Sequence, residues 1–229
     1  MTRWLPPTAG SAREPEEHED RSAYPDEFFV TEAPTLYGAG DHISAWAEAA
    51  LDWVGDGPIV VVGNSIGGSC AIEVAWLAPT KVKALVLCGT KPGVRPEPEL
   101  RDEALQVLAS EGLAAAWGRY WLPLFGPRAS TAVIERGWLS ALAQGEIAIA
   151  EGVRAFHGRP DRDAFLAAWP GPVAVVSGEH DIKPERSRRL ASRLPNATFH
   201  CIDGIGHYAP LEAPDAVTAI TAEAIATAT

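Results

Sequence analysis

The sequence predicts an α/β fold in which helices cover both faces of a mostly parallel, doubly wound sheet. Short runs of apolar, β-branched residues alternate with stretches of helical periodicity along the 229-residue chain. Strands that are apolar throughout are typical of parallel sheets with helices on both faces. Residues 91–169 contain no strand-like run, and this length predicts an inserted helical lid rather than a loop. Apolar residues make up 47% of the chain and charged residues 21%, which fits a globular core of this kind.

The expected strands and helices follow one another in a regular order. The strands are predicted over residues 27–32, 59–62, 84–88, 173–177 and 198–202. The helices between them are predicted over residues 43–54, 69–78, 184–194 and 213–226. Ligands of such a sheet bind beyond the carboxyl ends of the strands, so functional side chains are expected in the loops there.

The predicted lid is rich in aromatic residues. Its helical patches cover residues 99–110, 113–122 and 130–156, and the core is formed by residues 1–90 and 170–229. We expect the following lid side chains to line an apolar substrate pocket: Trp117, Trp121, Leu124, Phe125 and Trp138. The alternative is that these side chains only pack the lid onto the core.

The motif Gly63-Asn64-Ser65-Ile66-Gly67-Gly68 lies between a predicted strand and a predicted helix. A G-x-S-x-G motif in this context predicts a tight turn that exposes a serine hydroxyl at the carboxyl end of the strand. The glycines on either side of Ser65 are expected because side chains there would collide. Free N–H groups at the start of the helix would stabilise an oxyanion. The motif alone is a weak signal, and a glycine-rich turn with Ser65 as the helix N-cap is the alternative.

A serine hydroxyl needs a base to become a nucleophile, and the base needs an orienting acid. Of the six histidines, His207 stands out because it occupies a loop just beyond the last predicted strand. The other histidines are His18, His42, His157, His180 and His200. Asp181 follows the strand at 173–177 and is the first candidate for the acid, while Glu179 and Asp203 remain rivals.

Three segments of the chain together resemble the α/β-hydrolase superfamily, from about residue 27 onward. The Ser65 motif resembles the nucleophile elbow of this family, and residues 173–181 resemble its acid strand, which ends in G-x-x-D. Residues 206–214 resemble its G-H-x-x-x-x-E-x-P loop, and residues 37–41 its early glycine turn. The resemblance implies a catalytic triad of Ser65, Asp181 and His207, with the N–H of Ile66 in the oxyanion hole.

The amino-terminal segment departs from the family pattern. The family has two further strands and then a strand that ends in His-Gly, whose loop supplies a second oxyanion N–H. Here residues 3–5 stand in for that strand, and Pro6-Pro7 takes the place of His-Gly. Because proline has no N–H, the second donor would have to come from Thr8 or Ala9. We therefore expect a weakened oxyanion hole and slow turnover.

The expected function is that of a serine hydrolase acting on a small or medium apolar ester, lactone or thioester. The alternatives are a hydrolase of C–C bonds in ring-cleavage dienones, and a pocket protein or cyclase that no longer hydrolyses. We expect no cofactor and no metal, and a small-molecule acyl substrate as the partner. The net charge of −11 argues against nucleic acid and anionic membranes as partners.

The cellular location expected from the sequence is cytoplasmic. No apolar run approaches a membrane span, and the first residues have no signal-peptide core. The chain has three cysteines, an odd number that cannot all form disulfides within one chain. Cys70, Cys88 and Cys201 fall in predicted helices and strands. They are expected to be buried thiols of a reducing compartment. The sequence leaves the oligomeric state open.

Overall fold

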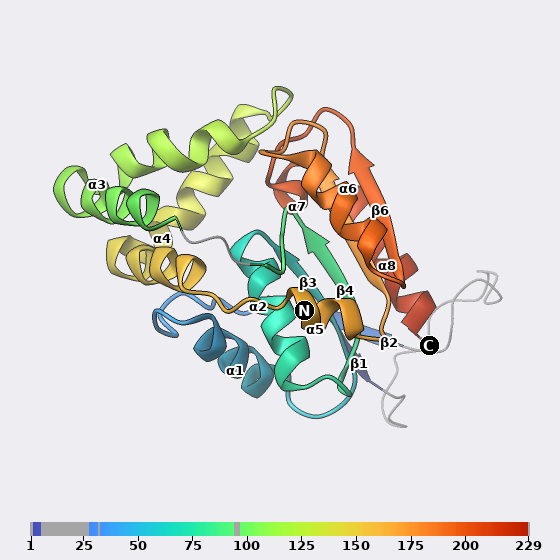
Figure 1. The fold of residues 1–229 in the computed structure, drawn as a ribbon. Coiled ribbons are helices and arrows are strands. Elements are labelled where there is room, and N and C mark those ends of the chain that lie inside the picture. The colour runs from blue at the N-terminus through green and yellow to red at the C-terminus, as the bar shows by residue number, and fades with distance from the viewer. Residues whose placement is uncertain (1, 6–27, 32, 94–96, 229) are drawn as a thin grey trace, which may run out of the picture.

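The computed structural model describes residues 2–5, 28–31, 33–93 and 97–228 (Figure 1). Its centre is a six-stranded sheet in the order β2-β1-β3-β4-β5-β6. The strands are β1 (Thr2–Leu5), β2 (Phe28–Thr31), β3 (Ile59–Asn64), β4 (Val82–Cys88), β5 (Val173–Gly178) and β6 (Ala197–Ile202). Strands β3 to β6 pair in parallel, whereas β1 is antiparallel to both of its neighbours.

Alternate side chains of the central strands enter two separate apolar cores. On β3, Ile59 and Val61 belong to one core, and Val60 belongs to the other. On β5, Val175 and Val176 divide in the same way, and both are completely buried. This explains why these strands are apolar at every position, because both faces of a parallel sheet are covered.

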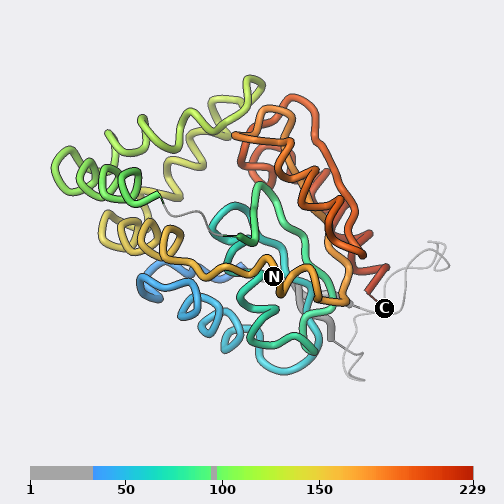
Figure 2. The backbone as a smooth tube through the Cα atoms, in the orientation of Figure 1, coloured from blue at the N-terminus to red at the C-terminus, as the bar shows by residue number. Residues whose placement is uncertain are grey.

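Helices complete both cores. The core on the first face is covered by α1 (Ile43–Val54), α2 (Ile66–Leu77), α5 (Asp163–Ala168) and α6 (Pro184–Arg193). The core on the second face is covered by α8 (Pro214–Ala228), with the short α7 (Ala209–Glu212) beside it. Figure 2 shows the same arrangement as a backbone tube, in the orientation of Figure 1. The predicted α/β fold with a mostly parallel, doubly wound sheet is confirmed.

Two long helices stand apart from the layers, in the segment where the sequence predicts a lid (Figure 1). They are α3 (Pro98–Ala116) and α4 (Thr131–His157), joined through the π-helical turn η2 (Trp117–Trp121) and the 3-10 turn η3 (Leu122–Leu124). Both helices are interrupted by a glycine with positive φ, Gly112 at 84° and Gly145 at 77°. The carboxylate of Glu146 accepts a hydrogen bond from the N–H of Leu113 at 3.0 Å, so the two interruptions lie side by side.

The cysteines differ in their exposure. Cys70 and Cys88 are buried, and burial raises the pKa of each thiol to about 12. Cys201 is exposed, so the prediction that it is buried is wrong. It lies on β6, the last strand in the described sheet order, in which no residue is fully buried. Among the described residues, none of the helices combines the length and apolar character needed to cross a bilayer.

A buried ion pair joins the end of the lid segment to helix α2. The guanidinium of Arg162 donates to both carboxylate oxygens of Glu73, at 2.8 and 2.9 Å, and the side chain of Glu73 is only 2% exposed. The hydroxyl of Ser44 donates to the same carboxylate at 3.0 Å, and the Arg162 guanidinium lies 4.2 Å from the ring centroid of Trp76. The pair fixes residue 162 against the helix that begins beside Ser65.

We expect Arg162→Ala to lower the free energy of unfolding by about 3–5 kcal/mol, because it leaves the buried Glu73 carboxylate without its cation. The measurement is urea unfolding, with Arg193→Ala as the matched control. Arg193 pairs with Asp163 at 3.3 Å, but both side chains are largely exposed, so that variant should cost below about 1 kcal/mol. Equal effects of the two variants would contradict this interpretation of the Glu73 pair.

Candidate active site

Ser65 lies at the tight turn between β3 and α2. Its φ is 54° and its ψ is −115°. Among the described residues, all other positive φ angles belong to glycines. The turn is held by two hydrogen bonds, from the N–H of Ser65 to the carbonyl of Cys88 at 2.9 Å and from Thr90 Oγ1 to the carbonyl of Ser65 at 2.8 Å. Ser65 occupies the N-cap position of α2, as the alternative expects, but its side chain makes no capping hydrogen bond to the helix. Such strain is characteristic of functional positions.

The glycines around Ser65 are needed for contacts that the motif alone does not reveal. A Cβ on Gly63 would lie 2.3 Å from the carbonyl oxygen of Gly67, and one on Gly68 would lie 1.9 Å from Thr90 Oγ1. A Cβ on Gly67 would meet nothing within 4 Å, so the prediction that a side chain there collides is wrong. The helix therefore approaches β3 closely at Gly63 and the segment that follows β4 closely at Gly68.

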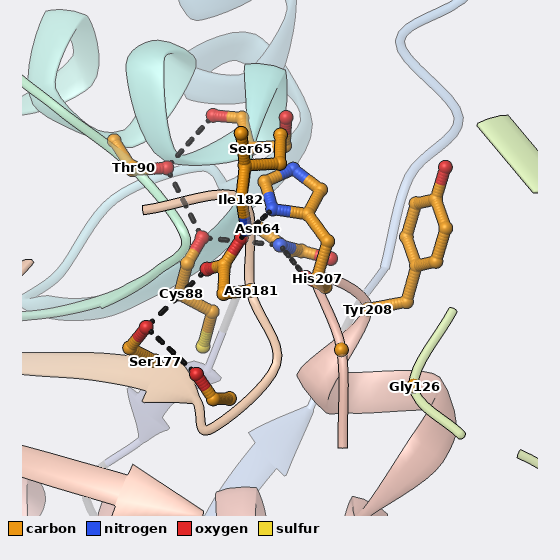
Figure 3. A network of polar contacts seen from close by, with 12 residues as sticks. Asn64, Ser65, Cys88, Thr90, Gly126, Ser177, Asp181, Ile182, His207 and Tyr208 are labelled. Carbon is orange, nitrogen blue, oxygen red and sulfur yellow. Dashed lines mark hydrogen bonds and ion pairs between the residues drawn. The ribbon is translucent and has the colours of Figure 1, made fainter. Parts of the chain in front are cut away.

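Asp181 and His207 meet at the carboxyl edge of the sheet (Figure 3). Asp181 Oδ1 lies 2.7 Å from His207 Nδ1, and the two side chains are 6% and 7% exposed. The carboxylate also accepts from the N–H of Ile182 at 2.6 Å and from Ser177 Oγ at 3.4 Å. These contacts orient the carboxylate toward the imidazole.

The rival acids are placed elsewhere. Glu179 Oε2 accepts from the N–H of Gly204 at 2.8 Å, and Asp203 is exposed. Gly89, which follows β4 with a φ of 56°, leaves the space that the His207–Asp181 pair occupies. A Cβ there would lie 2.8 Å from the His207 ring and 3.1 Å from Asp181 Oδ2.

Asn64 connects the serine turn to the histidine. Its Nδ2 donates to the carbonyl of His207 at 2.9 Å and to the carbonyl of Cys88 at 3.1 Å. Figure 3 shows the Ser65 side chain beside the His207 ring, with Asp181 on the other side of that ring. Asn64 thus links β3, the end of β4 and the histidine loop, a role that sequence reasoning missed although the residue belongs to the quoted motif.

Other described histidines have different partners. His42 contacts Asp41, His180 contacts Glu179, and His200 contacts Thr198. His157 ends helix α4, where burial lowers its pKa, and His18 lies outside the described residues.

Aromatic side chains of the segment predicted to be a lid form a continuous series of ring contacts that leads to His207. Ring centroids are 5.7 Å apart for Trp138–Trp117, 6.0 Å for Trp117–Phe125, 4.6 Å for Phe125–Tyr208 and 5.6 Å for Tyr208–His207. The five side chains predicted to line a pocket are divided: Trp117, Phe125 and Trp138 are in this series, Trp121 packs beside Tyr120, and Leu124 belongs to η3.

Two cavities of the structure lie away from these aromatics. A cavity of about 10 Å³ adjoins Ser69 and Lys91, and one of about 270 Å³ lies between α5 and α6. Neither is lined by Ser65 or by the five predicted pocket residues. The substrate pocket stays a prediction.

Ile66, the expected oxyanion donor, is the first residue of α2. The first N–H groups of a helix have no intrahelical acceptor and are available to an anion. The expectation for residues 3–5 is wrong in direction, because β1 pairs antiparallel to β3, with Thr2 opposite Val60 and Arg3 opposite Ile59. The carboxyl end of β1 therefore points to the edge of the sheet opposite Ser65. Pro6, Pro7 and Thr8 lie outside the described residues, so the role of Thr8 stays a prediction.

A model of the alpha/beta hydrolase family matches residues 10–220 of this chain. The chain belongs to the alpha/beta hydrolase family. The resemblance inferred from the serine, acid and histidine motifs is thereby confirmed. The family explains the common arrangement of the elements, in which the serine turn, the acid loop and the histidine loop all lie at one edge of the sheet.

Two curated enzymes are moderately similar to this chain. It is 32% identical to the 2-succinyl-6-hydroxy-2,4-cyclohexadiene-1-carboxylate synthase of Enterobacter sp. (strain 638), over 71% of this chain and 65% of that protein. It is 27% identical to the 2-hydroxymuconate semialdehyde hydrolase of Pseudomonas putida, over 73% of this chain and 63% of that protein. The alignments thus span slightly less than two thirds of the length of these two relatives.

A solved esterase of the same fold superimposes well on the structure. The thermophilic esterase from Thermogutta terrifontis matches with a TM-score of 0.72 and 23% identity, over 90% of this chain and 77% of that chain. At this identity the match shows the shared fold.

Proposed function

We propose that this alpha/beta hydrolase is a serine hydrolase with Ser65 as nucleophile, His207 as general base and Asp181 as the acid that orients it. The observation that carries the proposal is the 2.7 Å contact between Asp181 and His207 beside a serine held at positive φ. A buried carboxylate on Nδ1 leaves Nε2 of the imidazole to accept the serine proton. The placement of Asp181, His207 and the strained Ser65 at one edge of the sheet supports this assignment.

The proposed reaction proceeds through an acyl-enzyme. Ser65 Oγ attacks the carbonyl carbon of the substrate while His207 takes the hydroxyl proton. The N–H of Ile66 stabilises the oxyanion that forms. The bond to the leaving group then breaks, and His207 protonates that group. Water, deprotonated by His207, attacks the acyl-enzyme, and the acid leaves as Ser65 regains its proton.

The proposed substrate is a small or medium apolar ester, lactone or thioester. The aromatic series from Trp138 to Tyr208 supports an apolar acyl or leaving group, because it ends on the His207 ring. The likeness to the 2-hydroxymuconate semialdehyde hydrolase of Pseudomonas putida favours a second candidate, the hydrolysis of a C–C bond in a dienone. A non-hydrolytic pocket protein or cyclase is the third candidate, because Pro6-Pro7 takes the place of the family's His-Gly and is expected to weaken the oxyanion hole. The cytoplasmic location and the absence of membrane and nucleic-acid partners stay predictions from the sequence.

We expect a fluorophosphonate to label the protein rapidly and with a stoichiometry of about one, because an activated serine attacks phosphorus as it attacks a carbonyl. Mass spectrometry should find the label on the peptide that contains Ser65. Ser69→Ala, one turn further along the same helix, is the matched control and should label like the wild type. Absence of labelling would favour the non-hydrolytic candidate. Comparing p-nitrophenyl esters of increasing acyl length with a ring-cleavage dienone would then separate the first two candidates.

A further inference from the structure

A single carboxylate connects the lid segment to the loop that carries His207. We call residues 122–126 the lid turn and residues 204–208 the histidine loop. Glu212, the last residue of α7, accepts through Oε2 from the N–H of Gly126 in the lid turn at 2.8 Å and from Gly206 in the histidine loop at 3.0 Å. Its Oε1 accepts from the N–H of Tyr208 at 3.2 Å. Glu212 therefore binds the residues on both sides of His207 and the lid turn at the same time.

The backbone of His207 is itself tied to the lid turn. Its N–H donates to the carbonyl of Leu124 at 2.8 Å, while its carbonyl accepts from Asn64. The hydroxyl of Tyr208 adds a further link to the lid, through the carbonyl of Trp121 at 3.2 Å. All three N–H groups from Gly206 to Tyr208 are thus used in contacts with Glu212 or the lid turn.

The two segments approach so closely that neither can shift without the other. A Cβ on Gly206 would lie 2.3 Å from the carbonyl oxygen of Leu124, and one on Gly126 would lie 2.4 Å from the nitrogen of Gly206. Figure 3 shows Gly126 beside the loop that carries His207 and Tyr208. The backbones of the two segments are therefore packed without room for a side chain between them, and a displacement of one segment is transmitted to the other.

We propose that Glu212 is a positioning residue that holds the His207 imidazole in place by coupling the histidine loop to the lid turn. The inference rests on the proposed function for its effect on catalysis, whereas the coupling of the two segments stands on the hydrogen bonds alone. Hydrogen bonds to an ionised carboxylate are stronger than those between neutral groups. Removing the carboxylate releases Gly206 and Tyr208, and the imidazole between them loses its fixed relation to Asp181 and Ser65.

The first test measures ester hydrolysis by Glu212→Gln and Glu212→Ala. A displacement of about 1 Å at a reacting group can cost about 100-fold in rate, so we expect kcat to fall about 10-fold in Glu212→Gln and about 100-fold in Glu212→Ala. The Gln variant keeps one acceptor oxygen and should therefore be the milder. KM should change by less than about twofold, because the substrate contacts are left intact. The matched control is Glu223→Gln on the exposed face of α8, which should behave as the wild type.

The second test uses hydrogen exchange and needs no activity. In Glu212→Gln, the amides of Gly126, Gly206 and Tyr208 should lose protection together, and in Glu223→Gln they should keep it. Unchanged exchange in both segments, or loss in only one of them, would overturn the coupling. Coupled loss of protection with kcat unchanged would overturn the positioning role. If the wild type hydrolyses no ester while the exchange result holds, the proposed function fails and the coupling stands.

Discussion

Ser65→Ala is expected to lower kcat for short p-nitrophenyl esters by about a millionfold, because it removes the only atom that can form the acyl-enzyme. The fold should be unaffected, since the Ser65 side chain makes no capping bond to α2 and the turn is held by backbone contacts and by Thr90. The measurement is steady-state hydrolysis together with thermal unfolding of the same preparation. At a φ of 54°, alanine and serine have a similar backbone strain energy, because both carry a Cβ. The unfolding temperature of the variant should therefore equal that of the wild type.

Ser69→Ala is the control for this variant, because it alters a serine on the same helix and keeps the backbone hydrogen bond from the residue 69 N–H to the Ser65 carbonyl. It should retain the wild-type rate. A Ser65→Ala protein that keeps more than about a tenth of the wild-type rate would rule out Ser65 as the nucleophile. Replacing the serine of a catalytic triad lowers kcat by a far larger factor. A large loss in Ser69→Ala would instead show that the assay responds to general disturbance of α2.

Asp181→Asn is expected to lower kcat by about 10,000-fold, the size of effect found when a triad acid becomes an amide. Asparagine at this position would present an N–H to His207 or favour the wrong imidazole tautomer, so Nε2 could no longer accept the serine proton. The geometry would change little, because Asp181 and asparagine have the same shape and the N–H of Ile182 still finds an acceptor. The measurement is kcat over a range of pH, with unfolding as the test of folding.

Asp203→Asn provides the matched control, since it makes the same chemical change at an exposed carboxylate directly before the histidine loop. It should leave kcat within about threefold of the wild type. The assignment of the acid would be refuted if Asp203→Asn, or Glu179→Gln, lowered kcat more than Asp181→Asn does.

The sequence predicted those features that depend on local pattern. The strands at 59–62 and 173–177 were readable because both of their faces are buried, which makes every position apolar. The positions of Ser65, Asp181 and His207 followed from motifs attached to strand ends, and the structure brings Asp181 and His207 into contact there. The motif comparison placed residues 3–5 where the family has its His-Gly strand, but a strand of four residues carries no signal for its direction, and β1 runs antiparallel to β3.

Contacts between remote segments could not be predicted. Asn64 and His207 are separated by 143 positions, and no pattern in either segment indicates that the amide of one binds the carbonyl of the other. The same holds for Glu212 and the lid turn, and for Gly89, whose missing side chain matters only because His207 and Asp181 fill that space. The glutamate of the histidine motif was the one available signal, and it did not reveal what the carboxylate binds.

The paired glycine interruptions of α3 and α4 have a mechanical consequence. Gly112 and Gly145 lie at the same level of the two antiparallel helices, and Glu146 joins them by its bond to Leu113. The helical segments are stiff on either side of this level, so bending would concentrate along one crease that crosses both helices. The lid turn lies beyond that crease and is fastened to the histidine loop. The half of α4 that follows Gly145 is anchored in the first core through Ala155, while the aromatic half is fastened to the histidine loop through the lid turn, so the crease separates two anchored halves.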